Sequence, residues 1–299
     1  MIKNESVETT KKGRKVRERT EYHRLTLKND FMFSKVMQDK ELCIELLRRI
    51  LPELDIRSIE DVDAQKYLKH YYENKGSRLD IYATDQNGRR YDIEMQVDDV
   101  ANLPRRARYY SSMMDANDLL AGQEYDTVAV SYVIFICTKD PFELNQHMYE
   151  FRNICMTNPE VQLDDGSVKI FLNTKGTVGE ISPELRSFLK YLEGERLSEK
   201  DPYLDRLEKA VDRARQNEDW RTEYMFLKDI QRDSFVRGER AGKEEGRAEG
   251  RAEGLEEGRA EGEARIQKKA GDEIQKLLDD GLISKEAAER LQKSIDTVD

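Results

Sequence analysis

Residues 78–97 read RLDIYATDQNGRRYDIEMQV, and this stretch predicts a β-hairpin. Polar and apolar residues alternate on both sides of an Asn-Gly pair, which is typical of a tight turn between two antiparallel strands. The first strand is expected to direct Asp80 to one face and three apolar side chains to the other: Leu79, Ile81 and Ala83. The polar face of the second strand carries Asp92, Glu94 and Gln96.

The length of the turn decides whether the acids meet. A two-residue loop would put Asp80 opposite Met95 and would leave Asp80 and Glu94 on different faces. A three-residue loop, with Gly88 in the left-handed region, puts Asp80 opposite Glu94, with Gln96 next on the same face. We adopt the three-residue loop because it gathers two carboxylates and an amide. Two like charges that face each other repel unless a cation lies between them; the alternative interpretation is a half-exposed hairpin with a polar outer face.

The composition indicates a globular domain joined to solvated helical segments. The chain has 299 residues, of which 37% are charged and 37% hydrophobic. Its net charge of -10 argues against a protein that coats nucleic acid indiscriminately. The three cysteines lack metal-ligand spacing and suit a reducing compartment. Because no apolar run resembles a secretory leader or a membrane span, we expect a cytoplasmic protein without membrane contact.

Charge and periodicity divide the chain into five expected segments. They are a flexible basic tail (1–24), a folded domain (25–178), a helical extension (179–236), a charged repeat with glycine at every fourth position (237–265) and a small helical hairpin (266–299).

Within the folded domain, the spacing of apolar residues predicts a helix over about 29–50, which either Asn29 or Asp30 caps. Asp30 therefore has two interpretations, a cap or an acid aimed at the site. The other expected elements are a strand within 56–69, a helix over about 102–121, a strand buried on both faces over 127–137, and strands over about 148–156 and 167–173.

The helix over 102–121 begins with a basic cluster. Arg105, Arg106 and Arg108 occupy its first two turns together with Tyr109. Such a cluster is suited to contact a phosphate backbone. Alternatively, the arginines pair with neighbouring acids.

The repeat places seven glycines at strict four-residue spacing from Gly238 to Gly262. Glycine costs a helix about 1 kcal/mol relative to alanine, but a stripe of glycines permits close approach of a second helix. The repeat therefore indicates either self-association and partner docking or a charged helical spacer.

Several features stand in order along the chain: Lys28-Asn29-Asp30-Phe31-Met32-Phe33, Leu79-Asp80-Ile81, Ile93-Glu94-Met95-Gln96, the helix at 105–110 and the Glu-Gly-Arg-Ala repeat. Together they resemble the PD-(D/E)XK nuclease superfamily, and within it the recombination-promoting nuclease and transposase family. The resemblance covers roughly residues 25 to 262. It implies an α/β, restriction-endonuclease-like mixed sheet flanked by helices, followed by an extended helical C-terminal region.

The resemblance implies a metal-dependent DNA endonuclease. By motif position, Asp80 and Glu94 bind Mg²⁺, for which Mn²⁺ is a substitute, and the backbone carbonyl of Met95 is a further ligand. Gln96 is the third catalytic residue and stands where the superfamily usually has lysine. Glutamine can orient a water molecule, but it supplies no positive charge.

Further roles follow from the resemblance. The basic cluster of Arg105, Arg106 and Arg108 would hold DNA, with Asp30 and Tyr109 as accessory residues. The activity would serve DNA recombination, mobile-element transfer or defence, and the C-terminal repeat would support a homo-oligomer. The alternative function is a catalytically weak or inactive nuclease fold that binds DNA or assembles through its helical C-terminus.

Overall fold

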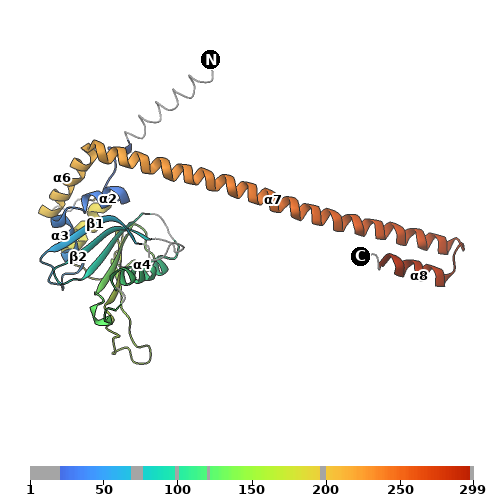
Figure 1. Cartoon of the computed structure of the whole chain (residues 1–299), viewed down its shortest axis with the longest axis horizontal. Coiled ribbons are helices and arrows are strands. Elements are labelled where there is room, and N and C mark those ends of the chain that lie inside the picture. The colour runs from blue at the N-terminus through green and yellow to red at the C-terminus, as the bar shows by residue number, and fades with distance from the viewer. Residues whose placement is uncertain (1–20, 69–76, 98–100, 120–121, 196–199, 297–299) are drawn as a thin grey trace, which may run out of the picture. The chain divides into compact units, whose positions relative to one another are not determined.

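The computed structural model describes residues 21–68, 77–97, 101–119, 122–195 and 200–296 (Figure 1). The chain divides into two compact units, Met1–Met225 and Phe226–Asp299. In the described part of the chain, no helix combines the length and the apolar character that crossing a membrane requires. Most of the expected basic tail lies outside the described residues. Its last residues are built into the first unit, because Tyr22 is buried and donates a hydrogen bond to the Ala214 carbonyl at 2.8 Å.

A mixed sheet of six strands forms the centre of the first unit, in the order β1-β2-β3-β4-β6-β5 (Figure 1). The β3–β4 and β4–β6 pairs are parallel, and the other pairs are antiparallel. The strands are β1 (Ile59–Leu68), β2 (Ser77–Asp85), β3 (Arg90–Gln96), β4 (Ser131–Cys137), β5 (Met148–Phe151) and β6 (Ser167–Asn173). The expected α/β fold with a mixed, restriction-endonuclease-like sheet is confirmed.

Helices cover both faces of this sheet. On one face, a large apolar cluster joins the sheet to α2 (Asp30–Val36), α3 (Lys40–Ile50), α5 (Pro183–Leu192) and α6 (Pro202–Gln216). On the other face, a smaller cluster joins it to α4 (Leu103–Asp118). The expected helical extension therefore contributes to the core of the first unit through α5 and α6.

Strand β4 supplies side chains alternately to the two clusters. Ile134 and Ile136 lie in the large cluster, and Val133 and Phe135 lie in the α4 cluster. All seven residues of the strand are buried, so the expected strand buried on both faces is confirmed. It begins at Ser131 instead of 127, because Thr127 belongs to the short 3₁₀ helix η1 (Tyr125–Thr127) and residues 128–130 have no regular structure.

The single helix expected over 29–50 is wrong, because the chain forms two helices there. Asn29 caps α2 by accepting the Met32 N–H at 3.1 Å. Helix α2 then ends, and Asp39 accepts the N–H groups at the start of α3. An aspartate that captures these N–H groups initiates a helix, so Asp39 restarts the helical backbone in a new direction.

The hairpin has the three-residue loop. The Asp85 N–H donates to the Arg89 carbonyl at 3.1 Å, and Gly88 has a φ of 75°. Ile81 therefore pairs with Ile93, as the longer loop predicts. The buried Asp85 carboxylate explains the choice, because it accepts the Asn87 N–H and the Arg89 N–H and so holds the loop closed.

One detail of the alternation in β2 differs from expectation. Leu79 is fully buried in the α4 cluster, whereas Ile81 and Ala83 lie in the cluster on the opposite face. The pairing of β2 with β3 ends at Ile81, so the chain before it follows β1 alone. Pairing with β3 therefore does not determine to which face of the sheet the Leu79 side chain points.

The C-terminal region is dominated by α7 (Glu218–Asp279), which continues through the whole glycine repeat. The end of the expected helical extension, the repeat and the start of the expected hairpin are thus joined in one helix. Exposed ion pairs spaced four residues apart support it, including Glu239–Lys243 and Arg259–Glu263. The expected break follows at Gly281, whose φ is 73°, and Ser284 caps α8 (Lys285–Asp296).

Candidate active site

The two acids of the hairpin lie together where β2 and β3 separate. Backbone pairing stops at Ile81 and Ile93, and Asp80 and Glu94 occupy the next step of the register. The Asp80 N–H donates to Glu94 Oε1 at 2.9 Å, and the Met95 N–H donates to Asp80 Oδ2 at 3.1 Å. Each carboxylate thus accepts a backbone N–H from the opposite strand. The predicted register and the proximity of the two acids are confirmed, whereas their catalytic roles stay predictions.

A third acid, Asp92, lies on the same face of β3. It is fully buried, and neither of its carboxylate oxygens receives a hydrogen bond from the described residues. Burial, together with the nearby charges of Glu94 and Asp80, raises the pKa of Asp92 well above its ordinary value. The alternation in β3 predicted Asp92 on the polar face but gave it no role; its position two residues before Glu94 was the available signal.

The Arg106 side chain reaches this face from α4. Its Nη1 donates to Gln96 Oε1 at 2.8 Å, and its Nη2 lies 3.2 Å from Glu94 Oε2. The Tyr110 hydroxyl, 3.0 Å from Nη2, forms a third contact. The sequence left two alternatives for the basic cluster, contact with a phosphate backbone or pairing with neighbouring acids. Arg106 shows the pairing, because it forms an ion pair with Glu94 of the sheet.

The other predicted residues of α4 point to solvent instead of to the acids of the sheet. Arg105 and Arg108 are exposed and remain candidates for contact with a phosphate backbone. Tyr109 is also exposed, whereas Tyr110 lies beside Arg106 and Glu94. Burial, together with the Glu94 charge, raises the pKa of Tyr110 to about 12, so this hydroxyl stays protonated. The sequence could not distinguish the two tyrosines, because the rotation of α4 over the sheet decides which one points inward.

Asp30 and Met95 complete the set of predicted residues. Asp30 is exposed in the first turn of α2, where it accepts its neighbour's N–H and lies near Tyr224. The structure therefore assigns Asp30 to the first turn of its helix, where its carboxylate accepts the Phe31 N–H. The Met95 side chain packs into the large cluster on the opposite face, so only its backbone belongs to the site.

The donor chemistry of the site fits a hard divalent cation. Asp80 and Glu94 offer carboxylate oxygens on one face, and such oxygens are the ligands that Mg²⁺ prefers. No group of three or more His, Cys, Asp or Glu side chains within the described ranges is arranged to hold a metal ion. A cation bound by two carboxylates would complete its shell with water and substrate oxygens, as Mg²⁺ commonly does.

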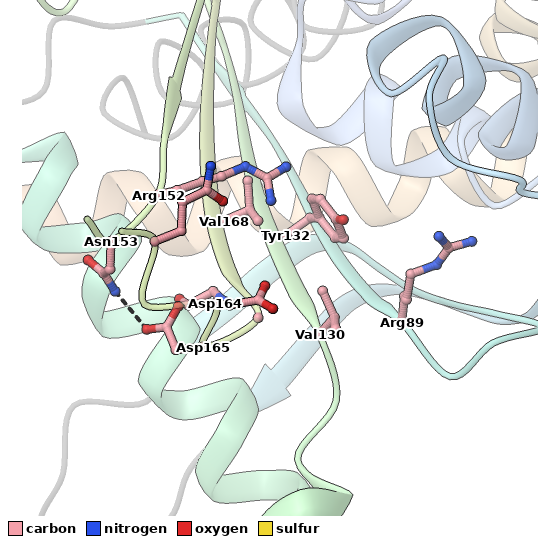
Figure 2. A pocket seen from close by; sticks show the side chains of 11 residues that line it. Arg89, Val130, Tyr132, Arg152, Asn153, Asp164, Asp165 and Val168 are labelled. Carbon is pink, nitrogen blue, oxygen red and sulfur yellow. Dashed lines mark hydrogen bonds between the residues drawn. The ribbon is translucent and has the colours of Figure 1, made fainter. Parts of the chain in front are cut away.

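A cavity of about 280 Å³ lies at the opposite end of the sheet, where β4 and β6 begin (Figure 2). Arg89 and Arg152 line it together with Asp164 and Asp165. Both arginines are already paired, since Arg89 binds Asp85 at 2.6 Å and Arg152 binds Glu150 at 2.5 Å. Its charges are therefore balanced, and it stands apart from the acids at the other end of β3.

The matched family agrees with this geometry. A family model described as "PD-(D/E)XK nuclease family transposase" matches residues 27–236. The match includes the whole sheet, the acids of the hairpin and α4, and it ends before the first glycine of the repeat. No curated protein and no solved structure matches the chain. The match spans more than half of the chain, and the chain therefore belongs to the PD-(D/E)XK nuclease family of transposases.

Proposed function

We propose that the protein is a Mg²⁺-dependent DNA endonuclease that hydrolyses phosphodiester bonds in DNA recombination, mobile-element transfer or defence. The observation that carries this proposal is the pairing of Asp80 with Glu94 on the face that α4 covers. Family membership supports a nuclease-related role for this face. Mn²⁺ would serve as a substitute, since it accepts the same oxygen ligands.

Each residue then has a defined task. Asp80 and Glu94 hold the cation, with the Met95 carbonyl as a further oxygen ligand. When bound, Mg²⁺ supplies charge neutralisation on the phosphate and favours an attacking hydroxide. The Gln96 amide orients the attacking water, and the exposed Arg105 and Arg108 side chains hold the DNA backbone.

The test is cleavage of supercoiled plasmid DNA with Mg²⁺, Mn²⁺ or Ca²⁺. Wild type should nick the plasmid with Mg²⁺ and Mn²⁺, and Asp80→Ala should not. Glu160→Ala is the control, because Glu160 is an exposed acid in the connection between β5 and β6. A wild type that leaves the plasmid intact with each metal would contradict the proposal.

A second candidate function is a DNA-binding or assembly module without cleavage. The pairing of Arg106 with Glu94 favours it, because a guanidinium competes with a metal ion for that carboxylate. In this case wild type and Asp80→Ala would bind DNA equally, and neither would cut it. Self-association through α7 is compatible with both functions, since the glycine stripe is exposed and a Cβ added at Gly246 or Gly250 would meet no neighbouring side chain within 4 Å.

A further inference from the structure

Hydrolysis of a phosphodiester places growing negative charge on the phosphate oxygens and on the leaving oxygen. A positioned cation stabilises that charge. Gln96 shares the face of Glu94, two residues along β3, but its amide is neutral. The positive charge at this point instead comes from α4, because Arg106 Nη1 lies 2.8 Å from the Gln96 amide oxygen.

We propose that Arg106 is a catalytic residue that supplies this positive charge to the phosphate, and that Gln96 is the positioning residue that holds its guanidinium. This inference rests on the proposed nuclease function and assigns the source of the charge within it. It differs from a general role of the basic cluster in DNA binding, because only Arg106 of the three arginines contacts the acids of the sheet in the described structure.

The surroundings of Arg106 fix the guanidinium before substrate arrives. The guanidinium donates hydrogen bonds to three oxygens, those of the Gln96 amide, the Glu94 carboxylate and the Tyr110 hydroxyl. Its Cζ lies 5.4 Å from the centre of the Tyr110 ring and 5.3 Å from that of Phe135, which restricts its plane. A donor group that is already oriented stabilises a transition state without the cost of reorganisation.

The guanidinium also remains accessible. The Arg106 side chain is 31% exposed, whereas the Glu94 side chain beside it is 5% exposed. A phosphate oxygen can therefore approach Arg106 from solvent while Glu94 stays behind it. Because a guanidinium has five N–H donors, the three contacts to Gln96, Glu94 and Tyr110 leave donors for a phosphate.

Gln96 suits Arg106 better than lysine would. The glutamine amide oxygen accepts the Nη1 proton, but a lysine ammonium has no acceptor and would repel the guanidinium. The two positions are thus expected to be coupled: one of them carries the cation, and the other accommodates it. This coupling predicts that the cation can be moved from position 106 to position 96.

The first measurement is cleavage by the full-length protein at saturating Mg²⁺. Arg106→Gln should lower kcat about 100-fold, which is the usual effect of removing one donor that stabilises developing charge. Arg106→Lys should retain part of the activity. Arg186→Gln is the matched control, since Arg186 is an exposed arginine on α5, which packs on the opposite face of the sheet. A loss confined to KM in Arg106→Gln would overturn the inference.

The second measurement is the charge exchange. The double variant Gln96→Lys/Arg106→Gln should recover at least tenfold over Arg106→Gln, because a lysine at position 96 points at the same site as Glu94. Gln96→Lys alone should be slower than the double variant, since its ammonium and the Arg106 guanidinium repel each other. Absence of recovery would show that Arg106 acts through its shape or its packing.

The third measurement does not depend on cleavage. Calorimetric titration with Mn²⁺ in the absence of DNA should show several-fold tighter binding by Arg106→Gln than by wild type, because the guanidinium no longer competes for Glu94. Weaker binding would mean that Arg106 only supports the geometry of the acids. If Arg106→Gln does not fold, Arg106→Lys decides the inference: cleavage well above that of Asp80→Ala supports a cationic role, and cleavage as low as that of Asp80→Ala overturns it.

These results separate the two proposals. A wild type that cleaves DNA together with an Arg106→Gln variant of equal kcat overturns the role of Arg106 and leaves the nuclease function standing. A wild type as inactive as Asp80→Ala overturns the nuclease function and the Arg106 inference with it.

Discussion

Asp80 and Glu94 have opposing effects on the stability of the hairpin: their like charges repel, and their carboxylates accept backbone N–H groups. The repulsion between the two carboxylates favours a bound cation. The hydrogen bonds that they accept from backbone N–H groups connect β2 to β3 at the step where backbone pairing ends. Removing a carboxylate would relieve repulsion but would leave a backbone N–H without its acceptor. An isosteric amide separates the two effects.

Asp80→Asn should therefore lose Mn²⁺ binding and DNA cleavage while it keeps the hydrogen bond from the Met95 N–H. Its melting temperature should stay within a few degrees of that of wild type, as expected for a change of less than about 1 kcal/mol. Asp80→Ala should melt lower than Asp80→Asn, since it lacks the acceptor. Calorimetry and a thermal melt of the three proteins check this, and an Asp80→Asn variant that binds Mn²⁺ like wild type would refute the ligand role.

Among the helices, α3, α5 and α6 are joined by one arginine. Arg49 of α3 donates two hydrogen bonds of 2.7 Å to Asp201, the residue that caps α6, and a third of 2.8 Å to the Glu184 carbonyl in α5. Burial opposes the charged form of Asp201, but the Arg49 guanidinium prevails and lowers the pKa of Asp201 below 3.8. The ionised pair thus fixes how three helices of the core meet.

Asp201→Asn should lower the free energy of unfolding by about 3 kcal/mol, because the buried Arg49 loses its bidentate partner and keeps only the longer ion pair with Glu45 at 3.5 Å. In wild type, the folded pKa of Asp201 is below the unfolded value, so this stability is present above about pH 3.8 and is lost as the pH falls below it. Asp55→Asn is the control, because the Asp55–Arg57 pair is exposed and should contribute nothing measurable. Denaturant unfolding at pH 7 and pH 3 tests both statements, and equal losses in the two variants would contradict the role of Asp201.

For the molecule as a whole, the two units differ in what stabilises them. The first has clusters on both faces of a sheet, whereas α7 beyond the boundary is exposed along the glycine repeat. A long helix with seven glycines in its repeat gains little from propensity, so contact with a second helix would compensate for its cost. This is the physical basis for expecting self-association of the chain.

Replacement of Gly246, Gly250 and Gly254 by leucine tests that expectation in the full-length protein. If the stripe is the contact surface, the bulky variant should dissociate at concentrations where wild type associates, and the triple alanine variant should show a smaller effect. Both variants should keep or raise helix content, since alanine and leucine favour helices more than glycine does. Light scattering and circular dichroism are the measurements, and an unchanged mass in the leucine variant would indicate that α7 is a spacer.

Local pattern in the sequence was sufficient for much of the fold and for half of the site. Alternation in the hairpin, the need for a left-handed residue at Gly88 and the uniformly apolar run of β4 are properties of adjacent residues, and each predicts its element without reference to the rest of the chain. The opposition of Asp80 and Glu94 follows from the same register.

The other half of the site was decided by tertiary packing. Whether Arg106 faces DNA or Glu94, and whether Tyr109 or Tyr110 points inward, depends on how α4 is rotated over the sheet, which contacts far apart in the sequence determine. The burial that raises the pKa of Asp92 has the same origin, because the alternation of β3 is the same whether its polar face is open to solvent or covered by a helix. The sequence by itself determined which residues share the face of the sheet, and only the fold determined what covers it, because register is a local property of the chain whereas burial is a property of the assembled layers.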